Sequence, residues 1–151
     1  MGRTTEYLMN IRRIIKIQEA LLKEVCQEFH LTLTEGTVIN FLHNNPGKDT
    51  AADIVELRML QKGNVSQAVD SLVKKGMLER EQDQEDRRKI HLHLTKEADP
   101  MLASVGKLWE KFSRELFKGI SWEELLSFDR VNEQMSENIQ RITGGKKNDG
   151  E

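Results

Sequence analysis

The sequence contains one cysteine, two prolines and few aromatic residues, and it has no long hydrophobic run. The single cysteine, Cys26, excludes an internal disulfide framework and is typical of proteins from a reducing compartment. Apolar stretches are only a few residues long, far short of the roughly 20 residues that span a bilayer. The first residues also lack the apolar core of a secretory signal. We therefore expect a cytoplasmic protein that has no membrane partner.

Charge is nearly balanced, because 23 Lys and Arg residues stand against 25 Asp and Glu residues, for a net charge of −2. This total argues weakly against a nucleic-acid partner. The distribution is uneven, since basic residues outnumber acidic ones by three in residues 58–96, between two segments with an acidic excess. The central excess fits a local nucleic-acid surface, and an uneven solvated surface is the alternative explanation.

Hydrophobic spacing predicts a mainly α-helical chain. Long helices are expected over roughly residues 4–29, 34–44, 62–75, 96–118 and 121–142, with a short helix capped by Thr50. Thr95 is expected to cap the helix at 96–118, and Pro100 should kink that helix or delay its start. The first helix has an apolar stripe too broad for one neighbour. The last helix is predicted to bury the face formed by Leu125, Phe128, Val131, Met135, Ile139 and Ile142.

The hydrophobic period changes from 3.6 to 2 after Gly76, which is a natural stop for the preceding helix. Alternation predicts short strands over Met77–Glu81 and Ile90–Leu94. The segment between them is polar throughout and ends in three cations. The sequence therefore predicts a small β-hairpin with a long charged tip.

The order of helix, helix and hairpin between residues 50 and 95 is that of a winged helix-turn-helix. The second helix of such a pair can lie in the major groove of DNA with its N-terminal residues against base edges. Amide side chains can pair with adenine, and a glycine lets the start of the helix approach phosphate closely. The residues predicted to contact double-stranded DNA here are Lys62, Gly63, Asn64, Ser66 and Gln67.

The hairpin tip offers a second contact with DNA. Arg87, Arg88 and Lys89 can reach the adjacent minor groove, whose negative potential attracts arginine. Asp86 is an acidic residue in this basic loop, and we expect it to hold an arginine through a charge-assisted hydrogen bond. An ordinary solvated hairpin is the alternative interpretation of this loop.

Residues 31–94 resemble the MarR family of winged-helix regulators. The matching segments are Leu31-Thr32 with Val38 and Leu42, Asp53-Ile54-Val55-Glu56, the run from Val65 to Arg80, and the segment from Asp83 to Thr95. The last segment is the most specific, because Asp86-Arg87-Arg88 followed by Leu94-Thr95 is similar to the family's wing signature, D-x-R followed by L-T. Together with the flanking long helices, the resemblance covers about residues 5–143.

The resemblance implies a homodimer with interleaved terminal helices. Residues 1–45 and 96–143 would form the helical dimerisation region, residues 46–95 the DNA-binding winged helix, and residues 144–151 a disordered tail. Such proteins bind pseudo-palindromic operators, usually as repressors, and release DNA when a small molecule, oxidant or metal alters the spacing of the two lobes. By position, Asp86 would orient Arg88 toward the minor groove. Met59 stands where a glycine is common, so the turn before the second helix is expected to differ in geometry.

Other residue types were weighed for further functions. Cys26 fits a buried, inert thiol better than a peroxide sensor, and His30, His43, His91 and His93 fit exposed histidines better than metal ligands. The aromatic residues Trp109, Phe112, Trp122 and Phe128 fit a helix-packing core better than an effector pocket.

No enzyme motif is present, so neither catalysis nor a cofactor is predicted. The alternatives to a DNA-binding repressor are a winged-helix module that binds a protein partner, and a redox- or metal-responsive regulator of the same fold.

Overall fold

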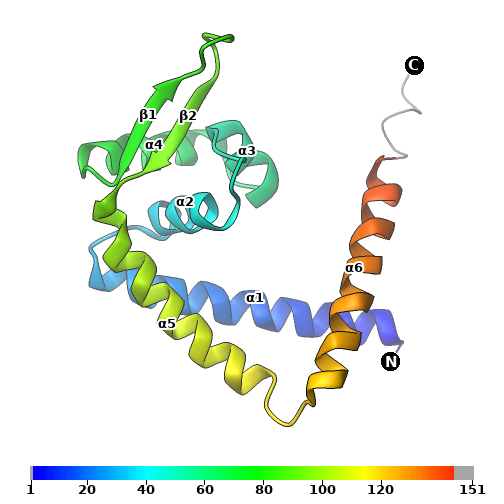
Figure 1. Cartoon of the computed structure of the whole chain (residues 1–151). Helices are drawn as coiled ribbons and strands as arrows, with labels where there is room; N and C mark the ends of the chain where they lie inside the picture. Colours follow the sequence, from blue (N-terminus) through cyan, green and yellow to red (C-terminus); the bar gives the residue numbers. More distant parts are fainter. Residues whose placement is uncertain (1, 145–151) are drawn as a thin grey trace. The chain divides into compact units, whose positions relative to one another are not determined.

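The computed structural model describes residues 2–144, which form helices and one antiparallel hairpin (Figure 1). In chain order the elements are α1 (Arg3–Glu28), α2 (Leu33–Asn44), α3 (Ala51–Arg58), α4 (Lys62–Lys74), β1 (Leu78–Gln82), β2 (Ile90–Leu94), η1 (Lys96–Ala98), α5 (Asp99–Leu116) and α6 (Trp122–Gly144). The chain divides into two compact units after Phe112, within α5. The predicted fold class, mainly α with a winged helix-turn-helix and long terminal helices, is confirmed. The tail predicted over residues 144–151 lies outside the described residues, except for Gly144.

Helix starts follow local capping chemistry, and the cap at Thr50 is one that the sequence predicted. The hydroxyl of Thr50 accepts the amide of Asp53 at 3.2 Å and begins α3, while the hydroxyl of Ser121 accepts the amide of Glu124 at 3.2 Å and begins α6. In both cases the carboxylate accepts a hydrogen bond from the backbone amide of the cap residue. These capping boxes satisfy backbone groups that the first turn of a helix leaves unpaired.

Of the two effects expected of Pro100 on the helix predicted over 96–118, a kink or a delayed start, the structure shows the delayed start. Residues Lys96–Ala98 form a 3₁₀ turn that Thr95 caps, and α5 begins only at Asp99. Pro100 is therefore the second residue of α5, a position where its missing amide costs no helical hydrogen bond.

The turn between α3 and α4 contains a residue with positive φ. Met59 has a φ of 52° and a ψ of 40°, which is a left-handed conformation that favours glycine, and the residue is 92% exposed. A residue with a Cβ has a steric cost in that region.

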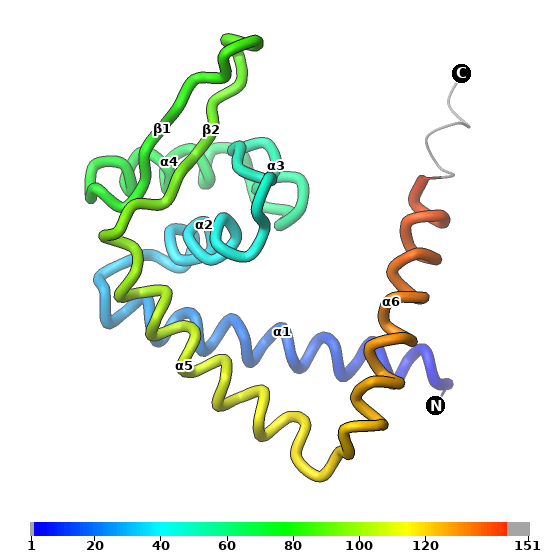
Figure 2. The backbone as a smooth tube through the Cα atoms, viewed as in Figure 1, coloured from blue at the N-terminus to red at the C-terminus, as the bar shows by residue number. Residues whose placement is uncertain are grey.

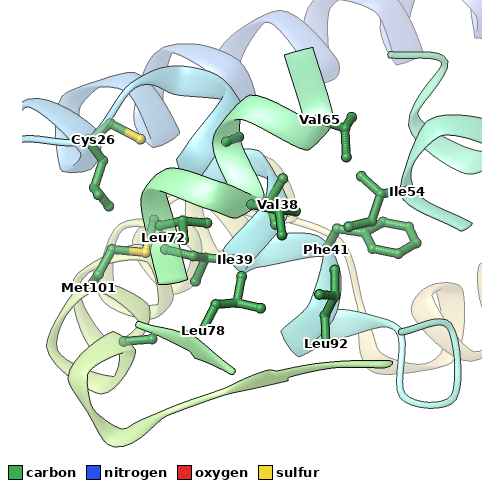
Figure 3. Packing of buried hydrophobic residues seen from close by; sticks show 14 of the residues in the cluster. Cys26, Val38, Ile39, Phe41, Ile54, Val65, Leu72, Leu78, Leu92 and Met101 are labelled. Carbon is green, nitrogen blue, oxygen red and sulfur yellow. The ribbon is translucent and has the colours of Figure 1, made fainter. Parts of the chain in front are cut away.

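The core of the first unit surrounds α2, which packs against α1, α4 and β2 (Figures 1 and 3). Val38 and Ile39 of α2 are fully buried. Residues from other elements complete the core: Cys26, Ile54, Val65, Leu72, Leu78, Leu92 and Met101. The strands pair with Leu78 opposite Leu94 and Arg80 opposite Leu92, and the loop between them extends away from the helices (Figure 2).

Several apolar residues that were predicted to be buried are exposed. No residue of α6 is buried, and Phe128, Val131, Ile139 and Ile142 on its apolar face are all exposed. Trp109 is also exposed, and Trp122 is 70% exposed, so the prediction of an aromatic packing core is wrong for these residues. The first half of α1 likewise exposes Tyr7, Leu8, Ile15 and Ile17. The spacing identifies an apolar face correctly, but this single chain does not cover it.

Within the described part of the chain, no helix combines the length and the apolar character that crossing a membrane requires.

Candidate nucleic-acid interface

The predicted contact residues of α4 lie on its solvent face. Val65, Ala68, Val69 and Leu72 recur at helical spacing and are buried against the core. Lys62, Gly63, Asn64, Ser66 and Gln67 occupy the remaining positions of the first two turns and are all exposed. A Cβ added at Gly63 would meet no atom within 4 Å, so no contact within the described chain requires a glycine there. The first half of α4 thus presents an amide-rich surface on a well-packed helix.

Two contacts hold α4 against neighbouring elements. Lys75, which caps the C-terminal end of α4, donates a hydrogen bond from Nζ to Glu35 Oε2 of α2 at 2.7 Å. Asp70 in the middle of α4 forms an ion pair with Arg80 of β1. Asp70 therefore connects the helix to the wing.

The wing tip is shaped by hydrogen bonds that backbone amides donate to carboxylates. Asp83 Oδ1 accepts the amides of Glu85 and Asp86, each at 2.9 Å, and Asp86 Oδ1 accepts the amide of Arg88 at 3.0 Å. Within the described chain the bond of Asp86 thus goes to the main chain of Arg88, whereas a bond to the guanidinium group was expected. Asp86 fixes the backbone from which the arginine side chain extends.

The basic residues of the tip are Arg87, Arg88 and Lys89, and all three are exposed. The loop is closed at its base by the amide of Asp83, which donates to the carbonyl of Lys89 at 2.9 Å. The side chain of Gln82 donates to the carbonyl of Arg87 at 3.0 Å. The tip therefore holds its cations on an ordered loop.

His91 differs from the exposed strand histidine that was predicted. Its Nδ1 lies 2.7 Å from Asp49 Oδ1, and its Nε2 lies 2.7 Å from Asp83 Oδ2. Hydrogen bonds to these two carboxylates raise the pKa of His91. Backbone amides and His91 lower the pKa of Asp83 far below its usual range. His93, by contrast, is exposed and lies 2.7 Å from Glu81 alone.

The sequence carries the family's signature in the same region. Residues 30–89, which include α2, α3, α4, β1 and the tip, match the sequence model of the MarR family. Over this segment the chain is similar to the MarR family.

Solved MarR-family structures have a similar fold. A MarR-family transcriptional regulator from Silicibacter pomeroyi is 23% identical, with a TM-score of 0.71 over 89% of each chain. A MarR transcriptional regulator from Methanosarcina mazei Go1 is 17% identical, with a TM-score of 0.70 over 91% of this chain and 99% of the other. A mutant of MepR from S. aureus, bound to an oligodeoxyribonucleotide, is 20% identical, with a TM-score of 0.57 over 92% of this chain and 96% of the other.

Among the residues considered for sensing, Cys26 is 1% exposed and packs in the core. Burial raises the pKa of its thiol, which keeps it in the unreactive protonated form. The prediction of a buried cysteine is confirmed. Residues 2–144 contain no group of three His, Cys, Asp or Glu side chains arranged to hold a metal ion.

Sequence reasoning missed two polar contacts of this MarR-family fold. Thr32 and Glu35 form a capping box, and the T-x-x-E spacing could have identified it, but the distant partner of Glu35 leaves no local signal. Asp83 was singled out only as part of the wing motif, and Asp49 was not considered. Asp49 is 42 positions from His91 in the sequence, and Asp83 lies across the hairpin from it, so neither contact leaves a local signal.

Proposed function

We propose that this protein is a transcriptional repressor that binds a pseudo-palindromic operator as a homodimer and is released by a small-molecule effector. The observation that carries the proposal is the pairing of an exposed amide-rich helix start, residues 62–67, with a cationic loop, residues 87–89, on one winged helix. The helix would read base edges in the major groove, and the loop would enter the minor groove. The likeness to a MepR mutant bound to an oligodeoxyribonucleotide supports this use of the fold.

The homodimer is supported by the apolar faces at both ends of the chain. Leu8 and Ile15 of α1 and Val131 and Ile139 of α6 are exposed, and each is one of several apolar residues that share a face. Exposed contiguous apolar faces of this kind mark protein interfaces, and a second copy of the chain is the simplest partner. A two-fold dimer would present two winged helices to two half-sites, which accounts for a pseudo-palindromic operator.

An effector site is supported by a cavity of about 340 Å³ within the first unit. One side is apolar and includes Leu21, Leu108 and Trp109, while Asn40 and His43 contribute polar groups. Such a mixture suits a small ligand that buries a ring and makes a few hydrogen bonds. None of the lining side chains is a lysine, arginine or carboxylate, so an uncharged aromatic compound fits best.

Fluorescence anisotropy with DNA from upstream of the protein's own gene tests DNA binding directly. We expect a preference of about a thousand-fold or more over a scrambled duplex, with log affinity falling steeply as log salt rises. Equal, weak binding to both duplexes, followed by no enrichment in a genome-wide selection of bound fragments, would contradict the proposal. That result would favour the winged helix as a module for a protein partner.

The dimer is tested by Ile139→Glu, which places a charge on the exposed apolar face of α6. Gln140→Glu is the matched control, because it adds the same charge one residue away, also on an exposed position. We expect sedimentation to show dimers for wild type and the control, and monomers with weakened operator binding for Ile139→Glu. An unchanged dimer in the Ile139→Glu protein would exclude this face from the interface.

The effector site is tested with Trp122→Phe, which leaves Trp109 in the cavity wall as the one tryptophan of the chain. A panel of uncharged aromatic compounds should include one that quenches Trp109 fluorescence and lowers operator affinity over the same concentration range. Release of DNA by a compound that leaves Trp109 emission unchanged would place the effector elsewhere.

A further inference from the structure

The ring of His91 connects two segments that are far apart in the sequence. Asp49 belongs to the loop between α2 and α3, and Asp83 begins the loop at the wing tip. Each carboxylate places one oxygen 2.7 Å from a different ring nitrogen, and the His91 side chain is only 24% exposed. A second tie joins the same segments, because the amide of Leu92 donates to the carbonyl of Asp49 at 2.7 Å. The base of the wing is therefore fastened to the helical body.

The chemistry of these contacts selects one protonation state. A neutral imidazole has one N–H and can donate to only one of two carboxylates, whereas an imidazolium donates from both nitrogens. Asp83 already accepts two backbone amides through its other oxygen, an arrangement that favours the ionised carboxylate. With both carboxylates ionised, the neutral ring would direct a lone pair at a carboxylate oxygen. Only protonated His91 satisfies both contacts.

The same carboxylate determines the shape of the DNA-contacting loop. Asp83 holds the amides of Glu85 and Asp86, and Asp86 in turn holds the amide of Arg88. The position of Asp83 is thereby transmitted through two hydrogen-bonded steps to the backbone of the basic residues. Loss of the contact between His91 and Asp83 would free this loop to adopt other conformations.

We propose that protonated His91 is a positioning residue that clamps the wing tip to the loop between α2 and α3, so that operator affinity falls as pH rises. The affinity part rests on the proposed DNA binding, and the clamp itself does not. Below the pH at which folded His91 titrates, the tip is held in the geometry described above. Above that pH, the neutral ring can donate a hydrogen bond to only one of the two carboxylates, and the tip loses its fixed position.

The groups around His91 favour its charged form. Asp49 and Asp83 contact the ring directly, and the same surface hollow is lined by Glu81, Glu85 and His93. Hydrogen bonding to Asp49, and then to Asp83, raises the pKa of His91, so the change falls above the ordinary value for histidine near 6.5. Stability contributed by the clamp is complete below that ordinary value and is lost as pH rises through the folded value.

Three variants of the full chain separate the clamp from other effects. His91→Gln is uncharged and presents a carbonyl oxygen to one of the two carboxylates. His93→Gln is the matched control, because it makes the same change on the same strand at an exposed residue whose ring pairs with Glu81. Asp49→Asn offers an amide donor to Nδ1, so that a neutral ring can still donate from Nε2 to Asp83.

NMR provides the readouts without DNA. We follow the ring titration of His91 and the hydrogen exchange of the amides of Glu85, Asp86 and Arg88 between about pH 5.5 and 8.5, comparing variants at each pH. In wild type His91 should titrate above the ordinary value for histidine, and in Asp49→Asn its titration should move toward that value. The tip amides should exchange faster in His91→Gln than in wild type at the acid end, and at the same rate in His93→Gln.

Operator affinity is then measured by anisotropy over the same range. We expect wild type and His93→Gln to weaken by roughly five-fold or more from the acid to the alkaline end, the lower end of typical couplings. His91→Gln should bind weakly throughout, and Asp49→Asn should lose most of the pH dependence. A His91 that titrates at the ordinary value for histidine, with tip amides unaffected by His91→Gln, would overturn the clamp. If the His91 titration and the tip amides behave as expected but the protein binds no DNA, the clamp is supported. That result would overturn the effect on affinity and contradict the proposed function.

Discussion

Glu35 Oε2 lies 2.7 Å from Lys75 Nζ and joins the first turn of α2 to the end of α4. Glu35 is 4% exposed and also accepts a hydrogen bond from Ser71 at 3.3 Å, while Lys75 donates to the carbonyl of His30 at 3.3 Å. A buried carboxylate needs such partners, because burial of a charge without them is costly. The placement of α4 on the core thus depends on a polar contact beneath its C-terminal half.

Lys75→Met should destabilise the protein by about 1–3 kcal/mol, because it leaves a buried carboxylate with fewer hydrogen bonds. Lys74→Met is the matched control, since Lys74 is the preceding residue and is exposed. Urea unfolding of both variants measures the difference. Equal stability of the two variants would show that the ion pair adds nothing to the packing of α4.

Glu35 should also make stability depend on pH under acid conditions. Burial alone would raise its pKa, but hydrogen bonds from Lys75 and Thr32 outweigh burial and lower it. The contribution to stability is therefore present above the ordinary value for glutamate and is lost as pH falls through the folded pKa. Between about pH 5 and 3 the unfolding free energy of Glu35→Gln should fall less than that of wild type. Parallel curves would refute a role for this carboxylate.

Local features of this fold could be predicted from the sequence. The capping boxes at Thr50 and Ser121 and the alternation in Ile90–Leu94 each depend on residues a few positions apart. The contacts between His91 and Asp49 and between Glu35 and Lys75 join residues that are 42 and 40 positions apart. Those pairs form only after tertiary packing, so periodicity and capping rules do not identify them.

The apolar face of α6 illustrates a second limit of the sequence. Spacing shows that Phe128, Val131 and Ile139 share a face, and the structure agrees, but all three are exposed in the single chain. A hydrophobic pattern indicates that a helix face is to be buried, but it does not indicate whether the same chain or a second chain buries it. The exposed apolar faces are therefore the strongest structural support for the proposed dimer.

Gly36→Ala should destabilise the protein, because Cys26 Sγ occupies the place where a Cβ on Gly36 would stand. Overpacking of this kind typically costs about 1–3 kcal/mol. In a Cys26→Ala background the sulfur is gone, so Gly36→Ala should cost much less there. Gly106→Ala, at a helical glycine with no atom within 4 Å of the added Cβ, is the control. Thermal unfolding of wild type, the two single variants and the double variant gives the coupling energy between the two positions. An equal loss of stability from Gly36→Ala in both backgrounds would exclude the proposed clash.

Arg88→Ala should weaken operator binding by about 1–3 kcal/mol and leave the melting temperature nearly unchanged. The side chain is exposed, and the bond of its amide to Asp86 is independent of side-chain identity. Arg88→Lys keeps the charge and should recover only part of the affinity if the planar guanidinium fits a narrow minor groove. Wild-type affinity of a folded Arg88→Ala protein would remove the wing from the proposed DNA interface.

Gly63→Ala should change stability and DNA affinity in opposite directions. In the unliganded chain the added Cβ meets no atom within 4 Å, and alanine loses less backbone entropy in a helix, so stability should rise by roughly 0.4–1 kcal/mol. If the start of α4 approaches DNA closely, the same Cβ occupies space that the phosphate backbone or a base edge needs, and affinity should fall. Gly106→Ala should raise stability without this loss. Because the gain and the loss come from one methyl group, unchanged operator affinity in a stabilised Gly63→Ala protein would place the start of α4 away from the DNA.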